Sequence, residues 1–122
     1  MIQRGLLIIL IITSASCGNR HGVEFIIHNN SNIKIDSIRV SSSDKRTTIK
    51  FVNIEKGATK QEFLDMGEVV KADGNYIVEL STLGIAKNKS IGYYTNGYPS
   101  EEKIDIYFEG DTIKYKSKIK EY

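Results

Sequence analysis

Residues 103–120, with the sequence KIDIYFEGDTIKYKSKIK, decide the fold of this chain. Two runs in which apolar and polar residues alternate, 103–108 and 112–120, flank a turn that contains Gly110. A period of two places alternate side chains on opposite faces of a strand, and a short Gly-containing break between two such runs is typical of a β-hairpin. This stretch therefore predicts two paired antiparallel strands, each with one face in a core.

The same pattern recurs along the rest of the chain, which points to a domain built of strands alone. Runs rich in β-branched and aromatic residues end at turn residues, and the Asn96-Gly97 pair is the strongest of these turn signals. No window of about eleven residues carries apolar residues at convincing helical spacing. We expect strands at 23–28, 33–40, 47–54, 76–80, 90–95, 103–108 and 112–120, with a weaker one at 61–66.

Many short strands without helices in one small domain are typical of two packed β-sheets. The sequence therefore predicts an all-β fold, an antiparallel β-sandwich of immunoglobulin-like or transthyretin-like type, over residues 23–122. The residues that we expect to face its core are Val23, Phe25, Ile27, Ile38, Val40, Ile49, Phe51, Tyr76, Val78, Leu80, Ile104, Ile106, Phe108, Ile113 and Tyr115. The last expected strand carries four lysines on one face. They either form a basic stripe for an anionic partner or protect an edge strand from pairing with another chain. These lysines are Lys114, Lys116, Lys118 and Lys120.

The composition excludes several classes of function. The chain has 122 residues, with 17 Lys and Arg against 15 Asp and Glu and a formal net charge of +2. This balance gives no reason to expect nucleic acid as a partner. One Cys and two His rule out a disulfide framework and the usual thiolate and imidazole zinc sites. We therefore expect neither a metal nor a cofactor.

Residues 1–16 have the layout of an export signal. Arg4 precedes an unbroken apolar run at 6–12, and small residues follow it up to Ser16. The run is too short to cross a bilayer, which takes about 20 apolar residues. We therefore predict a signal peptide at 1–16 that is removed from the mature protein.

The residues Ser14-Ala15-Ser16-Cys17 resemble the lipobox of bacterial lipoproteins. The small residues directly ahead of the Cys match that pattern, whereas Ser14 stands where the family prefers an aliphatic residue. The resemblance implies that Cys17 is lipidated and becomes the first residue of the mature chain. Residues 17–22 would then be the lipidated Cys and a short tether, with the membrane as a partner through the N-terminal lipid.

The residues around Cys17 also bear on processing and location. Cleavage by ordinary signal peptidase after Ala15 or Ser16 would instead leave a secreted chain with an unpaired Cys, which is a liability in an oxidising compartment. Gly18 follows the Cys, where an Asp would suggest retention at the inner membrane. We therefore expect a bacterial cell-envelope protein, lipid-anchored and in the outer membrane rather than the inner.

The sequence contains no clear catalytic constellation. His21 falls in the expected tether and His28 at the end of the first expected strand, and neither a nucleophile elbow nor a phosphate-binding glycine loop occurs. We therefore predict that the protein is not an enzyme. A dyad of His28 with a nearby carboxylate is the competing hypothesis, and a separation beyond about 6 Å would exclude it.

The most distinctive segment places three tyrosines beside the Asn96-Gly97 pair. Tyr presents a large amphipathic area at low entropic cost and so favours recognition surfaces. We expect Tyr93, Tyr94, Asn96 and Tyr98 to form a binding surface for a protein or a glycan. The alternative is that Tyr93 or Tyr94 packs in the core or across strands, while Asn96-Gly97 supplies only the turn.

Two short segments resemble the Asp-Ser/Thr-aliphatic O-glycosylation sequon of exported proteins in Bacteroidetes. They are Asp36-Ser37-Ile38 and Asp111-Thr112-Ile113. The resemblance implies that Ser37 and Thr112 are candidate O-glycosylation sites.

These features together predict a lipid-anchored, non-enzymatic envelope protein that serves as a binding or accessory module for an unknown ligand. The alternative is an envelope inhibitor of a hydrolase of the lysozyme type. Such an inhibitor would insert the 93–99 loop, which contains Tyr93 and Pro99, into the enzyme.

Overall fold

The computed structural model describes residues 21–120. The expected signal peptide at 1–16, Cys17 and most of the expected tether lie outside the described residues. No segment within 21–120 forms a helix that could cross a membrane. The regular elements of the described chain are β1 (Gly22–Asn29), β2 (Ile35–Ser42), β3 (Thr48–Ile54), β4 (Thr59–Asp65), β5 (Gly74–Thr82), β6 (Ile85–Thr95), β7 (Tyr98–Pro99), β8 (Glu101–Glu109) and β9 (Thr112–Ile119).

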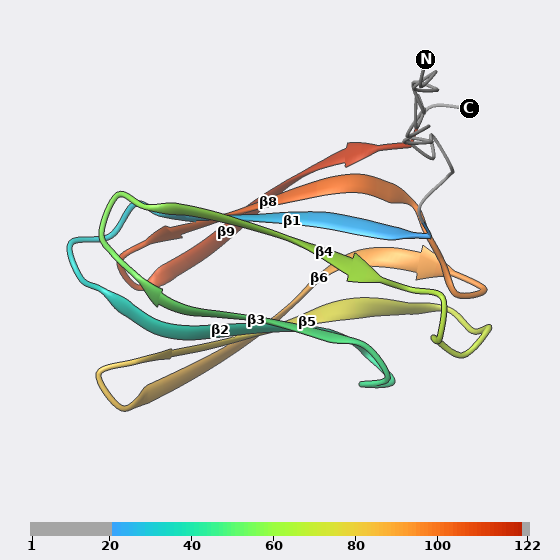
Figure 1. Cartoon of the computed structure of the whole chain (residues 1–122), viewed down its shortest axis with the longest axis horizontal. Coiled ribbons are helices and arrows are strands. Elements are labelled where there is room, and N and C mark those ends of the chain that lie inside the picture. The colour runs from blue at the N-terminus through green and yellow to red at the C-terminus, as the bar shows by residue number, and fades with distance from the viewer. Residues whose placement is uncertain (1–20, 121–122) are drawn as a thin grey trace, which may run out of the picture.

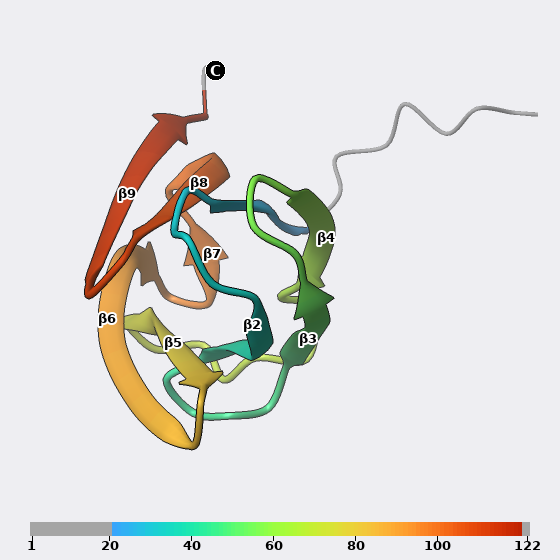
Figure 2. The ribbon, with the colours of Figure 1, turned by 90° about the vertical axis from the view of Figure 1, so that its left-hand side faces the viewer.

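The strands form two sheets that pack face to face (Figure 1). Sheet A has the order β4-β1-β8-β9, and sheet B has the order β3-β2-β5-β6-β7. In the end-on view of Figure 2 the two sheets curve around a shared interior, and β6 sweeps along one side of it. The predicted all-β, two-sheet fold is thereby confirmed for the described residues.

One pair of neighbouring strands, β1 and β8, runs parallel, so the expectation of a purely antiparallel arrangement is wrong at this pair. Phe25 lies opposite Ile104, and Ile27 opposite Ile106. Side chains alternate between the two faces of a sheet whether neighbouring strands run parallel or antiparallel, so a period of two in the sequence cannot tell the two kinds of pairing apart. A parallel pair needs a long crossover connection, and here the chain passes through all of sheet B and β4 between the two strands.

The core lies between the sheets and is built from the inward faces that the alternation predicted. Among the expected inward residues, Ile49 is only half-buried and Tyr115 is 43% exposed. Tyr115 lies on the edge strand β9, where Lys89 Nζ of β6 lies 6.0 Å from the ring centroid in place of an apolar neighbour. The largest buried side chains are Tyr76, Tyr94, Phe25, Phe108, Ile27, Ile38, Ile54, Leu64, Met66, Ile91, Ile104 and Ile106.

The two ends of the domain carry different loops. We define the proximal end as the end where β1 begins and the distal end as the opposite one. At the proximal end Gly22 of β1 lies opposite Asp65 of β4, and Glu101 of β8 lies opposite Ile119 of β9. The β6–β7 turn and the β4–β5 connection close this end, whereas the β5–β6 and β8–β9 turns close the distal end (Figure 1).

Candidate functional site

The tyrosine-rich segment forms the hairpin between β6 and β7 at the proximal end. Thr95 lies opposite Tyr98, and the residues between them, Asn96 and Gly97, have φ values of 52° and 77°. A two-residue turn with both residues left-handed matches the twist of the flanking strands, and Asn-Gly is its preferred sequence. The turn predicted from this pair is therefore confirmed.

The structure divides the three tyrosines of this segment between the surface and the core. Tyr93 and Tyr98 are exposed, whereas Tyr94 is only 2% exposed. The Tyr94 ring lies beside Tyr76, with centroids 5.5 Å apart, and its hydroxyl lies 2.9 Å from the Ser43 Oγ. The expectation that Tyr94 belongs to a binding surface is therefore wrong, because Tyr94 is a core residue.

A bulge at Gly92 causes this division. The register of β6 against β5 shifts by one residue between Ile91 and Tyr94, and Gly92, with φ 65°, takes the extra place. Strict alternation from the buried Ile91 would have turned Tyr93 inward. The extra residue reverses the phase, so that Tyr93 faces out and Tyr94 faces in.

Asp73, from the β4–β5 connection, holds the turn in place. Its Oδ1 accepts a hydrogen bond from the Asn96 N–H at 3.0 Å, and its Oδ2 accepts one from the Tyr93 hydroxyl at 3.2 Å. The Gly97 N–H donates to the Ala72 carbonyl at 2.9 Å. Because these contacts already order the turn, little conformational entropy would be lost if a ligand bound there.

His21, directly before β1, packs against the same turn. Its Nε2 lies 3.0 Å from the Gly97 carbonyl oxygen, and its ring meets the Tyr98 ring edge to face at a centroid distance of 4.6 Å. Gly22 is the first residue of β1. Both His21 and Gly22 were expected in the tether, but they are part of the folded domain.

A buried carboxyl group lies behind Tyr93. Glu101 Oε1 accepts a hydrogen bond from the Tyr93 N–H at 3.0 Å, while Glu101 Oε2 and the Tyr76 hydroxyl are buried and find no hydrogen-bond partner within the described chain. Burial raises the pKa of the Glu101 carboxyl, although the Tyr93 N–H opposes this shift. Burial also raises the pKa of the Tyr76 phenol, and the neighbouring Glu101 adds to that shift. The pair therefore favours neutral forms.

The residues around the turn form an exposed polar and aromatic surface. Tyr93, Asn96 and Tyr98 remain exposed around the turn, and Asp73 joins them as a residue that the sequence did not single out. Asp73 lies more than twenty positions before its partner Asn96, so no local motif links the two residues. Within residues 21–120, no three His, Cys, Asp or Glu side chains gather to hold a metal ion.

The outer face of sheet A brings His28 together with a carboxylate. His28 Nε2 lies 2.7 Å from Asp105 Oδ1 on β8, and Thr59 Oγ1 of β4 lies 3.4 Å from His28 Nδ1. The His28 ring stacks on Tyr107 at a centroid distance of 4.5 Å. The dyad that the enzyme hypothesis requires is thus present, and the parallel pairing of β1 with β8 creates it across 77 positions.

The backbone beneath this dyad is held in the ladders of sheet A. β1 is an interior strand, so its backbone amides are bound into ladders with β4 and β8. Stabilising an oxyanion needs donors that are free to point at the substrate. Lys103 of β8 pairs with the same carboxyl group, and its Nζ lies 3.8 Å from Asp105 Oδ2. The geometry is that of a polar cluster on a sheet surface.

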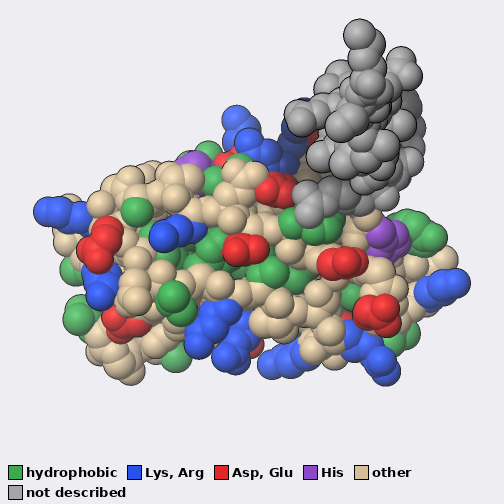
Figure 3. Space-filling view, viewed as in Figure 1, with side chains coloured by type: hydrophobic (Ala, Val, Ile, Leu, Met, Phe, Trp, Pro, Cys, Tyr) green, Lys and Arg blue, Asp and Glu red, His purple; other side chains and the backbone are tan. Residues whose placement is uncertain are grey.

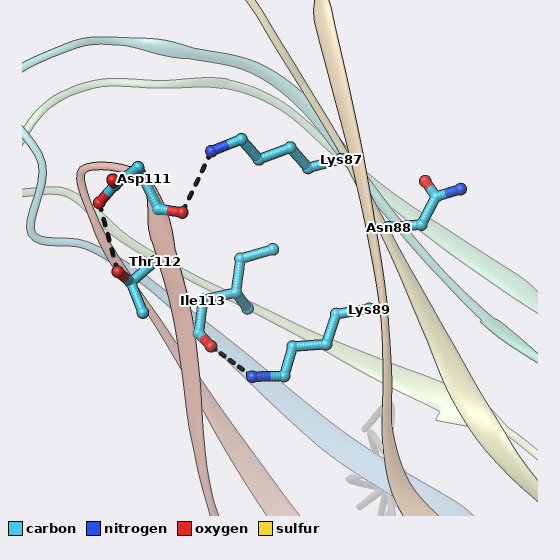
Figure 4. Close-up of a pocket in the computed structure, with 6 residues that line it drawn as sticks. All are labelled: Lys87, Asn88, Lys89, Asp111, Thr112 and Ile113. Carbon is cyan, nitrogen blue, oxygen red and sulfur yellow. Dashed lines mark hydrogen bonds between the residues drawn. The ribbon is translucent and has the colours of Figure 1, made fainter.

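The two candidate glycosylation residues occupy different environments. Ser37 is half-buried within β2, which lies between β3 and β5, opposite Val52 and Ser81. Thr112 is exposed at the start of β9, and its hydroxyl donates to Asp111 Oδ1 at 3.3 Å (Figure 4). Thr112 is therefore the more accessible of the two hydroxyl groups.

Lysines from sheet B cap the free edge of β9, as Figure 4 shows. Lys87 Nζ donates to the Asp111 carbonyl at 3.1 Å, and Lys89 Nζ donates to the Ile113 carbonyl at 2.7 Å. Unpaired carbonyls on an edge strand are a template for pairing with another chain, and lysines are a common protection. These contacts favour edge protection for this side of β9.

The lysines on the outward face of β9 are partly neutralised. Lys114 pairs with Glu109 at 2.9 Å, and Lys118 pairs with Glu102 at 3.5 Å. The face shown in Figure 3 likewise carries basic and acidic side chains interspersed. The four lysines therefore do not form an unpaired basic stripe.

Comparisons with known proteins add a fold likeness. No protein-family model matches the chain, and no curated protein matches it. Among solved structures, the NMR structure of a protein from Eubacterium rectale matches with a TM-score of 0.53 and 11% sequence identity, over 84% of this chain and 93% of that one. At this identity the match supports the shared fold alone.

Proposed function

We propose that this chain is a lipid-anchored protein of the bacterial envelope, in the outer membrane rather than the inner, and that its domain is a non-enzymatic binding or accessory module. The Tyr93 and Tyr98 side chains are its binding surface. Both are large, exposed and mounted on a turn that Asp73 and His21 already hold in place. A surface of this kind binds without first having to be ordered.

The observation that carries the proposal is the position at which folding begins. β1 starts at Gly22, only five residues after Cys17, the residue that the lipobox resemblance marks for lipidation. A folded domain that starts this close to the modified residue suits a protein held at a membrane surface. Two or more acyl chains would make that attachment stable.

We further propose the transthyretin-like rather than the immunoglobulin-like type of sandwich. In the immunoglobulin type the first two strands belong to the same sheet. Here β1 lies in sheet A and β2 in sheet B, and β1 pairs in parallel with the late strand β8.

The absence of enzymatic activity is proposed on the site geometry. His28 and Asp105 form a dyad, but no free backbone donor faces it from the interior strand β1. We also propose Thr112 as the residue modified if the glycosylation sequons are used, since Ser37 is half-buried between two strands.

Metabolic labelling with an alkyne fatty acid tests the anchor. The unaltered protein should incorporate the label and partition with membranes, and globomycin should block its processing. Cys17→Ser should lose the label completely, while Ser16→Ala, which keeps a small residue beside the Cys, should retain it. Labelling of Cys17→Ser at the level of the unaltered protein would overturn the proposal.

A further inference from the structure

Exposed apolar and aromatic side chains surround the point where the chain enters the domain. Tyr93, Tyr98 and Val70 are exposed at the proximal end, and Ile119 is exposed where β9 ends. The Lys120 N–H donates to the Ser100 carbonyl at 3.1 Å, and the Val70 carbonyl adjoins Gly97 of the turn. We call residues 93–98, the Asn96-Gly97 turn with its flanking tyrosines, the tyrosine turn. The tyrosine turn thus lies next to both the point where the chain enters the domain at His21 and the end of β9.

Chain length decides which end of the domain stays close to a membrane. Cys17 precedes His21 by four residues, and an extended chain spans at most about 3.6 Å per residue, so a lipid on Cys17 would hold His21 within about 14 Å. β1 has eight residues and is about 26 Å long at about 3.3 Å per residue. The proximal end is therefore always close to the bilayer, whereas the distal end can stand up to about 26 Å further away.

The side chains at the proximal end suit the interfacial layer of a bilayer. Tyrosine has an apolar ring and a polar hydroxyl, and for this reason it is enriched where hydrocarbon meets headgroups. Tyr98 has 58% of its surface exposed, and its ring is held edge to face by His21 rather than free to fold back. Val70 and Ile119 supply exposed apolar area at the same end of the domain.

The charges at this end give no preference for anionic lipid. Lys71 and Lys120 lie in a region that also holds Glu68 and Asp73, so basic and acidic groups balance. Electrostatic attachment to an anionic leaflet needs an excess of basic residues. The expected contact therefore depends on aromatic and apolar groups and is independent of anionic headgroups.

We propose that the tyrosine turn rests on the bilayer to which Cys17 is anchored, with Tyr98 and Tyr93 in the interfacial layer and Val70 beside them. This inference rests on the proposed lipid anchor and names the partner of the proposed binding surface. The contact fixes the orientation of the domain, so that its distal end, with the β5–β6 turn, points into the aqueous space.

The absence of Trp from the chain allows a direct test. Tyr98→Trp and Tyr93→Trp each place a single fluorophore on the proposed contact. Ile85→Trp is the matched control, because Ile85 is 56% exposed, nearly as much as Tyr98, and begins β6 at the distal end. Thermal unfolding monitored by circular dichroism verifies that each variant folds.

The measurement uses the mature lipidated protein, reconstituted into vesicles of phosphatidylcholine with and without headgroup spin-labelled lipid. Tyr98→Trp and Tyr93→Trp should show blue-shifted emission, quenching by the labelled lipid and loss of acrylamide quenching. Ile85→Trp should show none of these changes. Adding phosphatidylglycerol should leave the results unchanged.

Several outcomes would overturn the inference. Equal acrylamide quenching of Tyr98→Trp and Ile85→Trp in vesicles would show that the turn faces water. Protection of Tyr98→Trp in cell envelopes but not in pure lipid would identify a protein or glycan partner, including a hydrolase. Protection that requires phosphatidylglycerol would assign the contact to anionic headgroups. Failure to acquire lipid or to float with vesicles would instead refute the anchor of the proposed function.

Discussion

Two hairpin turns at opposite ends of the domain have the same backbone shape and different residues. At the proximal turn, Asn96 and Gly97 have φ values of 52° and 77°, and at the distal turn Leu83 and Gly84 have 50° and 73°. Both turns connect directly opposed residues through a two-residue loop. Asn tolerates the left-handed region, whereas a Leu in it is uncommon and costs roughly 1 kcal/mol.

The two turns also differ in what surrounds them. The proximal turn is held by Asp73, Ala72 and His21, while Leu83 is 74% exposed at the tip of the distal turn. The difference shows that the short connection and the strand twist alone impose the left-handed shape. The residue at the first turn position and the contacts that support the turn then decide how rigid it is. Those contacts are found at the proximal turn.

The largest expected effect comes from Gly92, the bulge residue that leaves Tyr93 facing outward and Tyr94 facing inward. A Cβ at Gly92 would lie 2.8 Å from a ring carbon of Tyr76, at a φ of 65°. Gly92→Ala should therefore lower the free energy of unfolding by about 3 kcal/mol, from the left-handed strain and the clash with a packed ring. Urea denaturation measures this loss.

The matched control lies at the distal turn. Gly84 has a similar φ of 73°, but a Cβ there would meet no atom within 4 Å. Gly84→Ala should cost only about 1 kcal/mol, the left-handed strain alone. Equal losses for the two variants would contradict the assignment of Gly92 as a tightly packed bulge residue.

The next effect concerns Glu101, whose carboxyl group is buried at the proximal end. Because the folded-state pKa of Glu101 is raised, its stabilising contribution is fully present below the pKa of an unfolded Glu, about 4.3, and is lost as the pH rises through the folded-state value. Glu101→Gln keeps an acceptor for the Tyr93 N–H and removes the charge. It should raise the free energy of unfolding at pH 7 by about 1–2 kcal/mol.

Denaturation between pH 4 and pH 7 tests this linkage. The unaltered protein should lose stability relative to Glu101→Gln as the pH rises, and the two should converge at the acid end of the range. Glu102→Gln is the control, since Glu102 is exposed and pairs with Lys118 at 3.5 Å. A difference between Glu101→Gln and the unaltered protein that does not vary with pH would refute the buried-carboxyl account.

Exchanging the residues of the two turns tests their comparison directly. Leu83→Asn should stabilise the protein by about 0.5–1 kcal/mol, because Asn accepts the left-handed conformation. The reverse change, Asn96→Leu, should destabilise it by about 1 kcal/mol. Melting temperatures by circular dichroism measure both. An unchanged melting temperature in both variants would show that the residue at these positions is immaterial.

The smallest expected effect is local. Asp73→Ala removes the acceptor of the Asn96 N–H and of the Tyr93 hydroxyl, so global stability should fall by about 0.5–1 kcal/mol. Amide hydrogen exchange at Asn96 should become faster, while exchange at Gly84 of the distal turn stays as it was. Unchanged exchange at Asn96 would mean that Asp73 does not rigidify the turn.

Much of the fold follows from local patterns. The hairpin of β8 and β9, the left-handed Asn96-Gly97 turn and nearly all of the expected inward residues follow from alternation and turn chemistry. The sequence missed Ile35, Ile54 and Leu64 of the core, which lie at strand ends or in the weakest expected strand. It also placed Tyr94 on the surface, because a bulge shifts the phase of alternation without leaving a distinctive local motif.

The candidate site could be predicted only in part. Tyr93 and Tyr98 were expected from their crowding beside a turn, and both are exposed. Asp73 and His21 were not, since each meets the turn across a long stretch of chain. The His28–Asp105 pair likewise depends on β1 and β8 becoming neighbours. The alternation of apolar and polar residues along β1 would be the same beside any other strand, so the sequence does not show this pairing.

By itself the sequence determined a chain of short strands, the hairpin of β8 and β9 and the Asn96-Gly97 turn. These features depend on interactions between residues close in the chain, which the printed order of residues already contains. The tertiary structure alone decided the parallel pairing of β1 with β8, the reversal at Gly92 and the gathering of His21, Asp73 and two exposed tyrosines at the end where β1 begins. Such contacts join distant segments, and they form only once both sheets have packed around one core.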